Sequence, residues 1–372
     1  ITVPISCWRC LPPSSRRFSY KTGVLTGLGL AVLGAFLFYP ASLAMTYGFF
    51  LLALFCLAGG LSILETSANP FVIAMGPEHN ATRRLNFAQA FNPVGTNIGV
   101  LLSASLILPN LNPATEAQRA AMTPDALDTI RQAELAAVMG PYVGFAVVLL
   151  VIWLLIAFCP MPARAETTPA TAGRIAFGAT LRRLLRNRHY AFGVVAQFFN
   201  VAAQTCTWTF TLHYVIGALG GTEAQAGWYL QASLVVFLLS RFAMVGLMGV
   251  LRPSLLLTGM AGLGVALASF AALSPGMAGV WAVVALSACL SLMFPTIYGI
   301  ALEGLGEDTK FGAAGLVMAI AGGAVLPMVH GAALDAFGPA PAFLVPAACF
   351  AVVALYGLFD LVSTRRLRGQ QI

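Results

Sequence analysis

Charged residues are scarce in this sequence. Lysine, arginine, aspartate and glutamate together make up 9% of its 372 residues, whereas a soluble domain carries roughly 25%. Hydrophobic residues reach 59%, and the 37 glycines fit membrane helices, in which glycine is more frequent than in soluble ones. The shortage of charge therefore excludes an ordinary soluble domain and indicates a membrane protein.

Sequence patterns of catalysis and metal binding are also missing. None of the seven cysteines has the spacing of a metal site. Cys7 and Cys10 alone are close together, and the other five lie in apolar runs, where packing is the expected role. The sequence contains no recognisable nucleophile–base pair or phosphate-binding loop. We therefore expect neither an enzyme nor a cofactor or metal ion.

Basic residues outnumber acidic ones by 20 to 13, which could suggest nucleic-acid binding. Their placement argues against that interpretation, because they occupy short segments between apolar runs, as residues that set membrane orientation do. All but Arg119 and Arg131 fall on the side of the membrane that holds the N-terminus. By the positive-inside rule this side is cytoplasmic. We expect a bacterial inner-membrane protein with both termini in the cytoplasm and no nucleic-acid partner.

Long apolar runs are what the sequence has instead. A helix that spans a bilayer needs about 20 mainly apolar residues. Ten such runs occur, at residues 22–40, 46–75, 85–109, 138–160, 190–218, 224–250, 254–273, 276–302, 310–334 and 340–363. The predicted fold class is an all-α multi-pass membrane protein with about ten spans, embedded in the lipid bilayer.

Two connections between the runs are long. The first includes TPDALDTIRQAEL (123–135), which predicts a short amphipathic helix capped by Thr123 and opened by Pro124. The second, residues 161–189, begins as a Pro/Ala/Thr linker and ends in a basic amphipathic segment that we expect along the membrane surface. These features divide the chain into an atypical N-terminal segment (1–21), a four-span bundle (22–160), an interbundle loop (161–189) and a six-helix bundle (190–372).

Two basic turns hint at an internal repeat. SRRFSYKTGVLTG (15–27) and GVLRPSLLLTG (249–259) both place basic residues immediately before an apolar span. If these turns correspond, two spans precede the turn in the second half and none does in the first. The chain would then be a six-plus-six transporter that lacks its first two spans. Transporters built from two such halves bind substrate between them, near the membrane midplane.

One acidic residue lies well inside a predicted span. Glu65, in SILETSANPFV (62–72), is eleven residues from the Gly76–Pro77 turn, which corresponds to about 17 Å along a helix. Such a carboxyl group marks a functional site by default, because it is costly in the membrane. The alternative interpretation is a structural carboxyl group that is protonated or bonded to a neighbouring helix.

Amides and aromatic residues recur in other spans. Gln89 and Asn92, in NFAQAFNPVGTN, are spaced i, i+3 and so share a face at a depth similar to that of Glu65. A second face, at steps of three, four and four, holds Gln197, Asn200, Gln204 and Trp208, and a later span carries Phe294 and Tyr298. Amides beside aromatic rings suit a sugar, whose hydroxyl groups need hydrogen-bond partners. The alternative is contact between helices, a common role for amides in membranes.

Several of these segments resemble the fucose permease branch of the major facilitator superfamily. They are LETSANPFVIAMGPE (64–78), RLNFAQAFNPVG (84–95), VAAQTCTWTF (201–210), FPTIYGIALEGLGEDTKFGAAGLVMAIAGGAVLP (294–327), and the region of Arg241 and LRPS (251–254). The resemblance extends from about residue 16 to residue 363. It implies a sugar–proton symporter of two six-helix bundles that works by alternating access.

The resemblance also implies roles for single residues. The residue matching Glu65 lies in the family's central cavity, and those matching Gln89 and Asn92 contact sugar. Phe294 stands where the family commonly has a cavity tyrosine, which would remove a hydroxyl group. The family's first span carries an acidic residue tied to proton coupling, and neither that span nor the second is recognisable here. We therefore expect an N-terminally truncated chain.

The leading hypothesis is a monomeric, proton-coupled importer of an L-fucose-type monosaccharide. Glu65 would carry the proton and contact the sugar with Gln89 and Asn92, while the second bundle would contribute the six amide and aromatic residues named above. One alternative is transport of glucose or galactose. Another is a membrane protein that does not transport, if the truncation is real.

Overall fold

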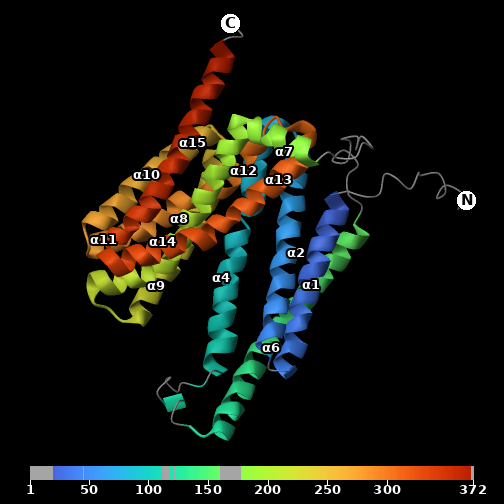
Figure 1. The fold of residues 1–372 in the computed structure, drawn as a ribbon, viewed down its shortest axis with the longest axis vertical. Coiled ribbons are helices and arrows are strands. Elements are labelled where there is room, and N and C mark those ends of the chain that lie inside the picture. Colours follow the sequence, from blue (N-terminus) through green and yellow to red (C-terminus); the bar gives the residue numbers. More distant parts are fainter. Residues whose placement is uncertain are drawn as a thin grey trace, which may run out of the picture. The chain divides into compact units, whose positions relative to one another are not determined.

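A computed structural model describes residues 20–44, 46–110, 112, 118, 119, 122–159 and 177–369. The regular structure of these residues is entirely helical (Figure 1). The predicted N-terminal segment 1–21 and the linker part of the interbundle loop lie almost wholly outside the described residues. The long helices are α1 (Tyr20–Ala44), α2 (Tyr47–Ala74), α6 (Pro124–Phe158), α8 (Arg188–Leu219), α9 (Glu223–Leu247), α10 (Pro253–Leu273) and α15 (Leu344–Gly369).

Shorter helices complete the described fold. They are α3 (Ala81–Gln89), α4 (Asn92–Leu102), α7 (Phe177–Arg186), α11 (Met277–Leu290), α12 (Met293–Leu302), α13 (Thr309–Met318) and α14 (Gly322–Phe337), with short 3-10 and π segments between or beside several of them. Nine helical segments in the described residues are long and apolar enough to cross a membrane. The remaining expected span, 190–218, is α8, whose 32 residues measure about 48 Å but include several amides. The prediction of an all-α multi-pass membrane protein is confirmed.

The chain divides into two compact units. Unit 1 consists of Ile1–Phe71 and Gly99–Arg174, and unit 2 of Val72–Ile98 and Ile175–Ile372. Residues 72–98, which the sequence assigned to the first bundle, thus group with the C-terminal helices: α3 packs on α9 and α12. The division into a four-span and a six-span bundle stays a prediction.

In unit 1, α1 and α2 pack backbone against backbone. A Cβ atom added to Gly27 would lie 2.5 Å from the Leu64 backbone nitrogen, and Gly34 and Gly60 meet the opposite backbone even more closely. Small residues at helix interfaces permit this approach and are a common basis of membrane helix association. The two glycines of α1 therefore fix the position of α2, including the turn that carries Glu65.

Helix α6 is held against α1 by side chains that donate hydrogen bonds to main-chain carbonyl groups of the other helix or of the residue that follows it. Trp153 Nε1 donates to the Leu25 carbonyl oxygen at 2.9 Å, and Lys21 Nζ donates to the carbonyl oxygens of Ala157 and Cys159. The separate amphipathic helix expected at 123–135 is wrong. Those residues begin α6, with Thr123 at its N-cap and Pro124 at its first position, and the helix continues into the span because Pro141 does not break it.

Unit 2 has the larger hydrophobic core. Buried side chains of α8, α9, α10, α11 and α15 form one cluster that includes Tyr214 and Phe350. Helices α10 and α15 lie side by side in it (Figure 1), because Gly264 faces the Phe350 ring and Gly357 faces Thr258. Tyr214 Oη donates to the Ala271 carbonyl oxygen at 2.7 Å, which satisfies the one polar atom of a large buried side chain.

Three membrane segments of unit 2 are broken helices. The first is interrupted at Ala90–Phe91, between α3 and α4, and the second at Ser291–Leu292, between α11 and α12. The third passes from α13 through a 3-10 turn (Ala319–Ala321) to α14. In the first two, a proline follows the break and cannot donate to the carbonyl four residues before it. Broken helices at membrane depth are tolerated where protein or a water-filled cavity surrounds them.

Candidate functional site

Glu65 lies in the second half of α2, five residues before Pro70. Its side chain is partly exposed, whereas Asn69 and Pro70, one turn on, are buried. Thr66, beside it, bonds back to the Ser62 carbonyl oxygen at 2.8 Å. Among the described residues of unit 1, no side chain forms a hydrogen bond or ion pair with the Glu65 carboxyl group. A carboxyl group so placed is able to gain and lose a proton without breaking an existing pair.

Gln89 and Asn92 belong to unit 2 and stand on either side of the first helix break. Gln89 ends α3 and is half-buried, while Asn92 begins α4 and is exposed. The expected shared face assumed a continuous helix, which the break at Ala90–Phe91 interrupts. Pro93 also leaves the Gln89 carbonyl without its usual helical donor. Both polar side chains therefore sit where the backbone itself offers hydrogen-bonding groups.

Gln197 and Asn200 are the most unusual polar residues of unit 2. Helix α8 is unbroken from Arg188 to Leu219, so their spacing places them along one side with Gln204 and Trp208. The two amides are 0% and 1% exposed, and none of their four side-chain nitrogen and oxygen atoms has a hydrogen-bond partner among the described residues. Buried polar groups are normally paired, because an unpaired one costs about 1–3 kcal/mol. Since both are closed off in this conformation, polar groups from outside the protein could pair with them only after neighbouring helices move.

Trp208 and Gln204, further along the same side, are half-buried. Trp208 Nε1 donates to Ser287 Oγ at 3.1 Å, and its ring meets Phe237 edge-on at 5.0 Å between centroids. The indole N–H is therefore occupied, and the ring face is what Trp208 retains for a ligand. Such an apolar face suits the C–H groups of a sugar ring.

Phe294 and Tyr298 differ in exposure although both lie in α12. Their rings stack with centroids 6.2 Å apart, but Phe294 is partly exposed and Tyr298 is completely buried in the hydrophobic cluster around Leu85 and Tyr190. Phe294 is the one with surface available to a ligand in this conformation. A substrate contact by Tyr298 would require α12 to move.

Sequence reasoning missed two features of unit 2. Arg241, assigned to the cytoplasmic side, is 5% exposed inside α9, with its guanidinium carbon 5.2 Å from the Phe237 ring centroid. The sequence did not predict this burial, although a charged residue in an apolar run marks a functional position by default. The second feature is the bond from Asn86 Nδ2 to Thr296 Oγ1, 3.2 Å long, which joins α3 to α12.

The predicted site residues thus fall into two groups. Glu65 belongs to unit 1, whereas the amides, the aromatic residues and Arg241 belong to unit 2, so their assembly into one site stays a prediction. Within unit 2 the groups offer hydrogen bonds, ring faces and one positive charge. No set of three or more His, Cys, Asp or Glu side chains that could hold a metal ion occurs in the described residues.

Comparison with known proteins identifies clear relatives. No family model matches the chain. It is 38% identical to the L-fucose-proton symporter of Escherichia coli (strain K12) over 346 residues, which are 92% of this chain and 79% of that protein. It is 33% identical to the glucose/galactose transporter of Brucella abortus biovar 1 (strain 9-941) over 350 residues, 94% of this chain and 80% of the relative. The crystal structure of the major facilitator superfamily transporter FucP in the outward conformation matches with a TM-score of 0.87 and 38% identity, covering 92% of this chain and 83% of that one.

Proposed function

Because the chain belongs to the family of the L-fucose–proton symporters, within the major facilitator superfamily, we propose that it imports a monosaccharide of the L-fucose type together with a proton. The observation that carries the proposal is the Glu65 carboxyl group, deep in an apolar helix and without a partner in its unit. A group that exchanges a proton during transport must be ionisable and must not be locked in a permanent pair. Its relatives are transporters, and the chain is not an enzyme.

In the proposed mechanism, Glu65 takes a proton from outside the cell and the sugar binds. Glu65, Gln89 and Asn92 contact its hydroxyl groups. Further contacts come from Gln197, Asn200, Gln204, Trp208, Phe294 and Tyr298, and the buried unpaired amides of α8, Gln197 and Asn200, gain hydrogen bonds when the helices around them move. Rocking of the bundles then exposes the site to the cytoplasm, where sugar and proton leave.

We further propose the orientation, location and assembly of the protein. The excess of basic residues on the side of the N-terminus favours a cytoplasmic position for both termini in the inner membrane of a bacterium. The protein would act as a monomer in the bilayer and use the proton as its only coupling ion, without an organic cofactor or metal. Truncation at the N-terminus stays a prediction.

Uptake by the purified chain in proteoliposomes tests the function. With an inward proton gradient, labelled L-fucose is expected to accumulate above its external concentration. Glu65→Gln should abolish this accumulation while leaving exchange of labelled for unlabelled sugar, because glutamine mimics the protonated carboxyl group permanently. Glu78→Gln, which removes an exposed carboxylate outside the span, is the matched control and should accumulate sugar normally. Proton-driven accumulation by Glu65→Gln would refute the role of Glu65.

A second sugar class has support of its own. The glucose/galactose transporter of Brucella abortus is 33% identical over 94% of the chain, and Phe294 replaces a tyrosine common in the fucose branch. Competition of labelled L-fucose with D-glucose, D-galactose and L-galactose would separate the two. Preferential inhibition by D-glucose would replace the fucose assignment, and the Phe294→Tyr variant should shift preference toward L-fucose if this position selects the sugar.

A further inference from the structure

Helix α7, in the interbundle segment, is oriented by its own buried face. Thr180 and Leu184, one turn apart, are 5% and 4% exposed. Leu184 packs into the cluster of unit 2 that also holds Leu85 and Tyr190. Because residues four apart share a face of a helix, this contact determines where the remaining side chains of α7 point.

Arg183 fastens the helix at a second point. Its Nη2 and Nε atoms donate to the two carboxylate oxygens of Asp308 at 2.8 and 3.0 Å, and Nη2 also donates to Thr180 Oγ1 at 3.1 Å. This two-bond geometry is the strongest form of arginine–carboxylate pair. The hydrogen bonds from Arg183 hold the pKa of Asp308 below its usual range. The positive charge of Arg183 is thus already matched.

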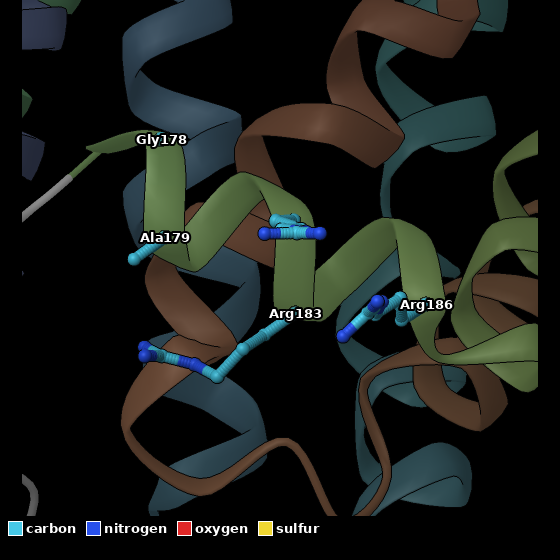
Figure 2. Close-up of a pocket in the computed structure, with 5 residues that line it drawn as sticks. Gly178, Ala179, Arg183 and Arg186 are labelled. Atoms are coloured by element: carbon cyan, nitrogen blue, oxygen red, sulfur yellow. The ribbon is translucent and has the colours of Figure 1, made fainter.

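Arg182 and Arg186 are in a different situation. They lie one turn apart, both exposed, and no carboxylate among the described residues pairs with either. With Gly178, Ala179 and Arg183 they line a hollow of about 410 Å³. Figure 2 shows Arg183 and Arg186 extending away from the ribbon of α7, while Gly178 and Ala179, at its first turn, leave space beside them. Two unmatched guanidinium groups and small neighbours form a hollow suited to an anion.

Leu181 and Leu185 occupy the adjoining side of α7. They are 43% and 64% exposed and lie about 100° around the helix from Arg182 and Arg186, given 3.6 residues per turn. Exposed leucines next to arginines are the pattern of a helix that lies at a membrane surface, with apolar side chains among the acyl chains and basic ones at the headgroups. This pattern favours a lipid headgroup as the source of an anion in this hollow.

We propose that Arg182 and Arg186 bind the phosphate of an anionic phospholipid, such as a phosphatidylglycerol, whose acyl chains run along Leu181 and Leu185. Guanidinium groups match phosphate geometry by paired hydrogen bonds, and anionic lipids make the cytoplasmic leaflet negative. The inference depends on the cytoplasmic orientation proposed above but not on the transported sugar. Through Arg183 and Asp308, the bound lipid would hold α7 on unit 2.

Ligand-dependent thermal stability of the full chain in detergent tests this site without any transport assay. Short-chain phosphatidylglycerol should raise the unfolding temperature in a saturable manner, because a ligand that binds only the folded state stabilises it. Arg182→Gln/Arg186→Gln should weaken the apparent affinity about 25-fold, since each basic residue near an anionic lipid surface contributes about 1 kcal/mol and 1.4 kcal/mol is a factor of ten. Short-chain phosphatidylcholine should stabilise weakly and equally in both proteins.

The matched control is Arg188→Gln/Arg252→Gln, which removes two exposed arginines of the same unit outside the hollow. It should bind phosphatidylglycerol as the unaltered chain does. An equal loss of affinity for phosphatidylglycerol in both double variants would refute the proposed site. If inorganic phosphate stabilises the unaltered chain as much as phosphatidylglycerol does, the assignment of the site to a lipid is refuted. If the α7 double variant does not fold, Arg186→Gln alone should weaken binding about fivefold, and an unchanged affinity would refute the proposal.

Discussion

Two carboxyl groups within the membrane segments, Glu65 in unit 1 and Asp360 in unit 2, have opposite surroundings. Asp360, in the second half of α15, is 8% exposed. It accepts hydrogen bonds from Ser254 Oγ and from His189 Nε2, which lies 2.6 Å from Asp360 Oδ1. Glu65 has no such partner in its own unit. A carboxylate bonded at both oxygens ties helices together, whereas an unbonded one is available for proton exchange. The partners rather than the depth therefore favour a structural role for Asp360 and are compatible with the role proposed for Glu65.

The largest expected effect is on folding, through Asp360. Asp360→Asn removes the charge that joins α8, α10 and α15 and should lower the free energy of unfolding by about 2–3 kcal/mol, because hydrogen bonds to charged groups are the strong ones. Glu65→Gln should change it by less than about 0.5 kcal/mol, since no bond is lost. Unfolding of both variants in detergent measures the difference. An equal loss of unfolding free energy in both variants would show that the hydrogen bonds of Asp360 do not set it apart from Glu65.

A second prediction concerns the glycine contact of α1 with α2, which positions the turn that bears Glu65. Gly27→Val would place side-chain atoms against the Leu64 backbone and should destabilise the protein by about 2 kcal/mol, the usual cost of overpacking. We expect sugar accumulation to fall with it, because the turn of α2 that bears the carboxyl group would shift. Gly59→Val is the control, since the nearest atom to a Cβ there is Leu30 Cδ2 at 3.9 Å. Transport by Gly27→Val at the normal rate would show that the position of this turn is not critical.

The smallest effect is expected at a third acid, Asp308. Its pKa is lowered by Arg183, so the pair contributes stability above the ordinary pKa of aspartate, about 3.9, and loses it as pH falls through the lowered value. Arg183 is 62% exposed, and solvent screening limits the contribution to less than about 1 kcal/mol. When the pH is lowered from 6 to 3, the unfolding temperature should therefore fall slightly more for the unaltered chain than for Asp308→Asn. An identical fall would mean that the pair contributes nothing measurable.

The sequence predicted the helical class and most membrane segments because long apolar runs need no knowledge of partners. It also selected Glu65, since an acid in such a run is conspicuous, and it placed the residues of α8 on one side because that helix is unbroken. It did not predict the break between Gln89 and Asn92. Proline weakens a helix, but tertiary packing determines whether the helix bends or breaks.

Contacts between segments far apart in the chain also could not be predicted from the sequence. The bond between Asn86 and Thr296 and the pairing of Asp360 with Ser254 and His189 join residues more than 100 positions apart. Neither residue type nor local spacing indicates such partners. The burial of Arg241 was missed for a different reason: it was counted with the basic loop residues, although the apolar residues on both sides of it in α9 indicated burial.

The glycine contact between α1 and α2 restricts how the carboxyl group of Glu65 can change the side of the membrane that it faces. The Leu64 backbone lies against Gly27, and the Gly60 backbone lies against that of Ala31, so α2 cannot rotate or slide along α1 without a collision of main chains. We therefore expect the two helices to move together as one rigid body. If Glu65 carries the coupled proton, as proposed above, its access changes only when both helices tilt, and the proton moves with two helices instead of with a swinging side chain.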